Sequence, residues 1–209
     1  MNPAAINALL QAARSLHLSA SHCSHAYVVP AFVSSWVAWE ALRTRFIGVV
    51  IHHQGWTLKD ADNVLARAKI SSMDRAAGVI QNLYIKNPHQ WPVVSASAWR
   101  LLCDVEPLRH RLVHGFKTVD PIRTKTATRL VLFLVENHQW LESVPLVDAK
   151  KKKDRVLVGS LLSSRRAHPI GNQRKVEELA SKLQLDLTQA CKRLPSLDQL
   201  TSAIESYGA

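Results

Sequence analysis

Residues 32–50, FVSSWVAWEALRTRFIGVV, decide the fold class of this 209-residue chain. Large apolar side chains recur there every three or four positions, which is the spacing of one face of an α-helix. They are Phe32, Trp36, Trp39, Leu42 and Phe46. We therefore predict a long helix over residues 24–53, with Pro30 near its start or at a kink.

The same spacing predicts further helices on both sides of this segment. The expected ranges are 4–18, 57–68, 71–83, 95–113 and 124–141. Thr57 and Ser71 or Ser72 are expected to cap two of them, and Ser95-Ala96-Ser97 a third. Pro107 should bend or break the helix that contains it. The apolar run 130–135 also suits a buried strand, but its length and neighbours favour a helix.

These segments predict an all-α fold, in which a bundle of four to five helices occupies residues 1–148. A basic linker and a small helical extension are expected over residues 149–209. Lys150, Lys151, Lys152 and Lys153 mark the change, because four adjacent like charges favour an exposed segment. Residues 156–158 suit either a short strand or the start of a helix.

The formal net charge of +11 favours an anionic partner such as RNA, DNA or an acidic surface. The three cysteines are widely spaced, which argues against a disulfide framework and a cysteine-based zinc site. No secretory signal and no apolar run long enough for a membrane span is evident. We therefore expect a cytoplasmic protein that has no contact with a membrane.

The chemistry is expected in residues 109–115, RHRLVHG. His110 and His114 are four residues apart and so share one helix face, and Gly115 can end the helix. A histidine can move protons near neutral pH, and a guanidinium such as that of Arg109 can stabilise a negatively charged phosphorus centre. The set suits RNA cleavage without a metal or other cofactor. Clustered cations at a helix C-terminus also occur without a catalytic role.

Arg109, His110 and His114 resemble the signature of HEPN domains, which is Arg, a polar residue, three further residues and His. Gly115 is also typical, and residues 36–43 resemble the long early helix of several members. The resemblance implies a helical, dimeric, metal-independent endoribonuclease, often a toxin with an antitoxin partner or a factor in anti-phage defence. HEPN toxins silenced by adenylylation carry a tyrosine where this chain has Phe116.

We expect Arg109 and His114 to be catalytic, with His110 assisting and Arg111 in support. Arg43, Lys117 and the four lysines 150–153 are expected to contact RNA. Glu40 either forms an ion pair within its own helix with Arg43 or orients a motif residue across the domain. We expect the tryptophans to lie in the core and, with the helix around residues 28–50, at a homodimer interface.

Other functions remain open or are disfavoured at this stage. One alternative is a dimeric adaptor that binds RNA or protein without catalysis, and another is a DNA-binding regulator. The histidine spacing also resembles that of zinc metalloproteases, but Arg111 stands where that motif needs a glutamate base.

Overall fold

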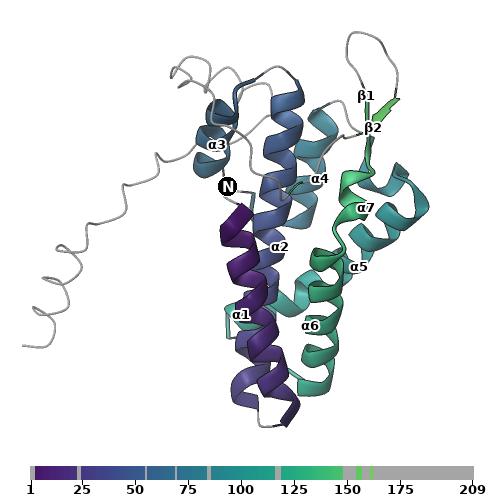
Figure 1. Ribbon diagram of the computed structural model, residues 1–209. Helices are drawn as coiled ribbons and strands as arrows, with labels where there is room; N and C mark the ends of the chain where they lie inside the picture. Colours follow the sequence, from purple (N-terminus) through teal and green to yellow (C-terminus); the bar gives the residue numbers. More distant parts are fainter. Residues whose placement is uncertain are drawn as a thin grey trace, which may run out of the picture.

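The computed structural model describes residues 3–22, 25–54, 56–68, 70–83, 86–115, 119–147, 154–156 and 161. Within these residues the chain forms a helical bundle with a two-stranded hairpin (Figure 1). The helical fold predicted from the sequence is confirmed, although it has more helices than expected. The helices are α1 (Pro3–His22), α2 (His25–His53), α3 (Leu58–Arg67), α4 (Met73–Asn82), α5 (Val93–Val113), α6 (Pro121–Glu136) and α7 (Gln139–Glu142).

Helix α2 is the central element, and α1 and α6 run beside it along the long axis of the bundle (Figure 1). Its tryptophans lie in a cluster of aromatic rings contributed by several helices. The ring of Trp39 lies 6.1 Å from that of Trp99 on α5 and 5.9 Å from that of Trp140 on α7. Burial of such large side chains stabilises the fold by about 1.5–3 kcal/mol each. The expected core role is confirmed for these residues.

Most of the apolar surface of α2, where we expected a dimer interface, lies within the chain's own core. Its large apolar side chains, among them Phe32, Trp36 and Phe46, are fully buried in the chain's own core. The exposed apolar side chains of the helix are Tyr27, Val29 and Val37. Val29 and Val37 are eight residues apart, the spacing of one helix face, so contact of this helix with a second copy stays a prediction. The apolar pattern of α2 therefore reflects contact with neighbouring helices of the same chain.

Polar contacts fix the other helices at particular points. Nη2 of Arg14 on α1 lies 2.8 Å from a carboxylate oxygen of Glu136 on α6. The side chain of Glu106 on α5 accepts a hydrogen bond of 2.9 Å from the backbone N–H of Met73, the first residue of α4. Thr57 and Ser72 cap α3 and α4 as predicted, since each accepts a hydrogen bond from an N–H in the first turn.

Several helix ends differ from the predictions. Helix α5 begins at Val93, and Ser95 caps nothing, because its hydroxyl donates to the carbonyl of Trp140. Pro107 lies inside α5, which continues past it. Asp120 caps α6 earlier than expected, and this helix ends at Glu136 before the short α7. Residues 130–135 are helical, so the prediction of a helix there is confirmed.

The hairpin follows α7 and brings a later residue back to the bundle. Strand β1 (Pro145–Val147) pairs antiparallel with β2 (Asp154–Val156), with Leu146 opposite Arg155. Residue 156 is thus in a strand, one of the two predicted alternatives. Leu161 is fully buried; its carbonyl accepts a hydrogen bond from Arg45, and its N–H donates to Glu142. The basic linker and helical extension predicted over residues 149–209 lie outside the described residues, apart from 154–156 and 161.

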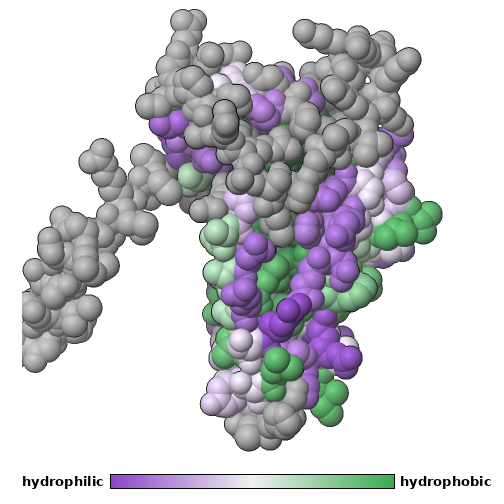
Figure 2. All heavy atoms as spheres, in the orientation of Figure 1, coloured by the Kyte–Doolittle hydropathy of each residue, from purple (hydrophilic) through white to green (hydrophobic). Residues whose placement is uncertain are grey.

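The face of the bundle that carries α1 and α6 is largely polar. Figure 2 shows hydrophilic side chains on both sides of a narrow hydrophobic strip on the face that carries α1 and α6. Among the residues that the structure describes, no helix is both long and apolar enough to cross a lipid bilayer.

Candidate active site

The predicted motif lies at the C-terminal end of α5. The helix runs to Val113, and the N–H of His114 closes its last turn by donating to the carbonyl of His110 over 3.2 Å. Gly115 follows with a φ of 65°, a left-handed conformation that glycine adopts without strain. The chain therefore leaves the helix directly after the second histidine, as the sequence predicted.

His110 and His114 are neighbours on one exposed face of this helix end. Their ring centroids are 4.5 Å apart and the ring planes cross at 63°. Both side chains are exposed to solvent. Two imidazoles this close can act on the same substrate, one taking a proton and the other giving one.

Arg109 lies beside the histidines but faces α2. Its Nη2 is 3.4 Å from Oε1 of Glu40, and the same oxygen accepts a hydrogen bond of 3.0 Å from Nε1 of Trp36. Of the two roles considered for Glu40, the contact across the domain to a motif residue is therefore the one present. Trp36 was not predicted as part of the site, although its spacing of four residues from Glu40 offered a signal.

Arg43, which we expected to contact RNA, is instead a buried structural residue. Its side chain is 2% exposed, and its Nη2 donates to the carbonyl of Ile70 over 3.0 Å. Burial lowers the pKa of this guanidinium from its ordinary value, while Glu40 and Glu106 act in the opposite direction. The side chain is thus occupied between α2 and the start of α4 and does not reach the surface, which corrects the prediction.

Arg111 projects to the other side of the motif, where a groove opens between α5 and α6. The groove has a volume of about 740 Å³, and Arg111 forms part of its wall. Two acidic residues that the motif did not point to, Asp104 and Asp120, also line it. Asp104 lies on the same side of α5 as Arg111, seven residues earlier, so helical periodicity was the available signal.

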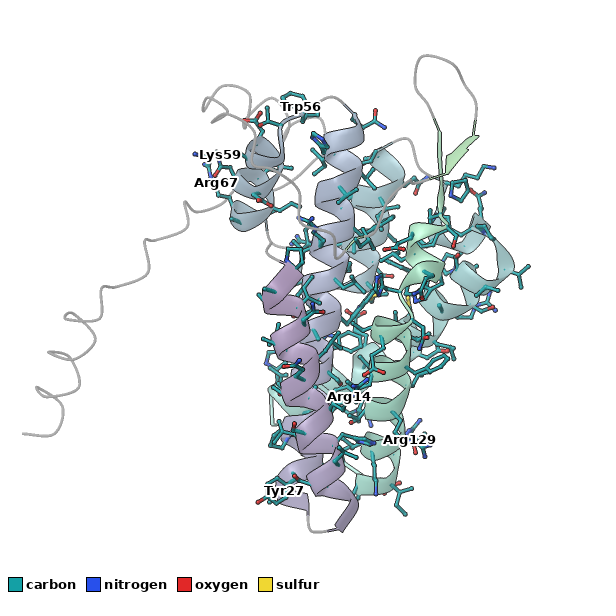
Figure 3. All side chains as sticks on the ribbon, in the orientation of Figure 1. Arg14, Tyr27, Trp56, Lys59, Arg67 and Arg129 are labelled. Carbon is teal, nitrogen blue, oxygen red and sulfur yellow. The ribbon has the colours of Figure 1, made fainter. Side chains whose placement is uncertain are left out.

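A second group of cations lies on the face formed by α1 and α6. Figure 3 shows Arg14 and Arg129 on this face, far from Trp56, Lys59 and Arg67 on and before α3. Burial lowers the pKa of His17 on α1, and the charges of Lys125 and Arg129 on α6 lower it further. Because Arg14 is paired with Glu136, the positive charge that acts on His17 comes from Lys125 and Arg129.

The remaining predicted RNA-contacting residues, Lys117 and Lys150 to Lys153, lie outside the described residues, as does Phe116. In the described part of the chain, no three histidine, cysteine or acidic side chains gather as a metal site would require. Comparisons of the chain with protein-family models, with characterised proteins and with solved structures give no match.

Proposed function

We propose that this chain is a metal-independent endoribonuclease of the HEPN type, acting as a toxin or in anti-phage defence. One observation carries the proposal: two exposed histidines lie 4.5 Å apart at a helix end, beside an arginine that contacts a glutamate of another helix. Acid–base groups and a fixed cation are what cleavage of an RNA phosphodiester requires.

The proposed reaction begins when one histidine, His114, takes the proton of the ribose 2′-hydroxyl. The 2′-oxygen then attacks phosphorus, the bond to the 5′-oxygen breaks, and His110 gives a proton to that leaving oxygen. The products are a 2′,3′-cyclic phosphate and a free 5′-hydroxyl. Arg109 and Arg111 stabilise the extra negative charge on the phosphoryl oxygens in the transition state.

The direct test is incubation of the purified protein with single-stranded RNA in the presence of EDTA. His114→Ala is expected to lower the cleavage rate by about 10²–10⁴-fold, the usual contribution of an acid–base group. His89→Ala is the matched control, because His89 is exposed on the 3-10 turn Pro88–Gln90, away from the motif. Full activity of His114→Ala, or a requirement for added Mg²⁺, would contradict the proposal.

The proposal includes a homodimer in which two motifs face one RNA strand. His110 and His114 are exposed, so a second copy can approach them, and a two-fold symmetric dimer is the commonest oligomer. Light scattering is expected to give twice the chain mass of 23.3 kDa. Mixing inactive Arg109→Ala and His114→Ala chains should restore part of the activity if the motifs form a composite site, whereas a fully active monomer would rule out the dimer.

A second candidate is a non-catalytic adaptor, and one surface favours it. A groove of about 760 Å³ lies between the start of α5 and the end of α6 and is walled by exposed apolar side chains. Val93, Val94 and Phe133 are 83%, 70% and 61% exposed. Exposed apolar groups in one patch mark protein contacts, which an antitoxin would also use. Growth arrest on expression, relieved by Arg109→Ala, would support the ribonuclease, and harmless expression would support the adaptor.

A further inference from the structure

The groove beside Arg111 differs in chemistry between its two ends. Helices α5 and α6 run in opposite directions along the groove. At one end of the groove the last turns of α5 lie beside the first turns of α6. At the other end, earlier residues of α5 lie opposite later residues of α6. Arg111 and Arg123 therefore mark the end next to the motif, and Asp104 and Leu130 mark the far end. In the part of the chain that the structure describes, neither arginine forms an ion pair.

Of the two carboxylates that line this groove, that of Asp104 binds no other described group. Asp120 uses one oxygen to cap α6, accepting a hydrogen bond of 3.0 Å from the N–H of Ile122. Asp104 has no hydrogen bond or ion pair with any described residue and is exposed. The carboxylate of Asp104 repels a phosphate group, although the chain as a whole carries a net charge of +11. The ligand group that fits beside it is therefore one that donates hydrogen bonds.

The spacing along α5 matches one nucleotide. Asp104 and Arg111 are seven residues apart on the same side of the helix, which places their backbones about 10 Å apart at 1.5 Å per residue. That is about the reach of a nucleotide from its phosphate to the far edge of its base. Between them the groove presents Pro107, Leu108 and Leu130, which are apolar surfaces for a sugar and a base. A volume of about 740 Å³ lies within the range of small-ligand sites.

We propose that this groove is a guanine-specific subsite for single-stranded RNA, in which Arg111 and Arg123 bind the 3′-phosphate of a guanosine and Asp104 accepts hydrogen bonds from its base. The inference rests on the proposed ribonuclease function, because the bound phosphate is then the one that is cleaved.

Guanine is the base whose hydrogen-bonding edge fits a carboxylate. Its N1–H and N2–H₂ are adjacent donors on one edge, so both oxygens of a carboxylate can accept from it. Adenine and cytosine each place an acceptor nitrogen beside their amino group, and uracil flanks its single N–H with two carbonyls. Each of these arrangements sets an acceptor against the negative charge of Asp104. Recognition of unstacked bases by such edges is how proteins read single-stranded RNA.

The first test measures binding without cleavage. The full-length His114→Ala protein is titrated calorimetrically with the 3′-monophosphates of guanosine, adenosine, cytidine and uridine. We expect guanosine 3′-monophosphate to bind at least tenfold more tightly than the others and Asp104→Asn to remove that preference. Asp74→Asn, which changes an exposed acid on α4 outside the groove, is the matched control and should leave it unchanged. Thermal unfolding checks that both variants fold.

The second test maps cleavage sites by the wild-type protein on an RNA that contains all four bases equally. The subsite is supported if the wild-type protein cleaves on the 3′ side of guanosines and the Asp104→Asn variant cleaves after all four bases. Guanosine-selective binding with no cleavage supports the groove assignment and overturns the ribonuclease. Cleavage without base preference overturns the subsite and leaves the ribonuclease standing, even if the free guanosine nucleotide binds. Equal binding of all four nucleotides also overturns it.

Discussion

The carboxylate of Glu40 on α2 joins two groups through a single oxygen. Oε1 lies 3.4 Å from Nη2 of Arg109 on α5 and accepts a hydrogen bond from Nε1 of Trp36, which is itself buried in the core. The orientation of the motif arginine is thereby linked to the packed interior of the bundle. A glutamate held in this way restricts where the guanidinium of Arg109 can lie.

Replacement of Glu40 by glutamine should weaken catalysis while leaving the fold intact. Glutamine keeps an acceptor oxygen for Trp36 but removes the negative charge that faces Arg109. We expect kcat for RNA cleavage to fall by about tenfold, equivalent to about 1.4 kcal/mol, with little change in Tm. Glu136→Gln is the matched control, since Glu136 pairs with Arg14 on α1. Equal kcat values for the two variants would show that Glu40 does not position Arg109.

Gly115 offers a test of backbone geometry at the motif. Its φ is 65°, yet a Cβ added there would meet no atom within 4 Å, so the loss in Gly115→Ala comes from backbone strain alone. We expect unfolding free energy to fall by about 1 kcal/mol and Gly115→Asn to cost less, because asparagine tolerates this conformation. Chemical denaturation measures both.

The control for that strain is Gly78→Ala in α4. Gly78 also has open space around it, but it lies in an ordinary helical conformation. Alanine favours a helix interior over glycine, so this variant should gain about 0.5–1 kcal/mol of stability. An equal gain in unfolding free energy for Gly115→Ala would show that Gly115 does not adopt the left-handed conformation after His114.

Two tryptophans that touch each other should respond differently to the same substitution. Nε1 of Trp140 donates to the carbonyl of Leu134 over 2.9 Å, whereas Nε1 of Trp39 has no hydrogen-bond partner among the described residues. Trp140→Phe is expected to cost about 1 kcal/mol more than Trp39→Phe, because only the former loses a buried hydrogen bond. Urea unfolding of the two variants gives the comparison, and an equal or larger cost for Trp39→Phe would contradict it.

Cys103 should be an unreactive thiol. Burial, together with the carboxylates of Glu106, Asp74 and Asp104, raises its pKa to about 11. Because the ordinary value is 9.0, thiolate at pH 8 should be about a hundredfold scarcer than in an unfolded chain. Alkylation, followed on the Cys103 peptide by mass spectrometry, should be slowed to that extent and accelerate tenfold per pH unit up to about pH 11. A rate that levels off near pH 9 would contradict this.

Local signals in the sequence were sufficient to place the long helices, though not all of their ends, and to predict the motif's own geometry. Thr57 and Ser72 cap their helices because the groups they bond lie three residues away in the same chain segment. The pairing of His110 with His114 follows from helix spacing alone, and so does the exit of the chain at Gly115. Interactions set by short separations along the chain can be predicted before the fold is known.

Contacts between helices could not be predicted in this way. Ser95 resembles a cap, but its hydroxyl bonds to Trp140, which is 45 residues away and becomes a neighbour only after folding. Arg43 and Glu40 stand at a spacing typical of an ion pair, yet each side chain finds a partner on another element. The choice between two satisfactory partners depends on packing, which a single helix pattern does not specify.

The burial of Leu161 indicates how long a fragment of this protein must be to fold on its own. Ending the chain at residue 148, where the sequence suggested a boundary, would empty the space that this leucine fills and leave the polar groups of Arg45 and Glu142 without the backbone atoms they bind. The helical bundle is therefore completed by a residue from beyond its own helices. A protease-resistant core of the protein is therefore expected to extend at least to residue 161.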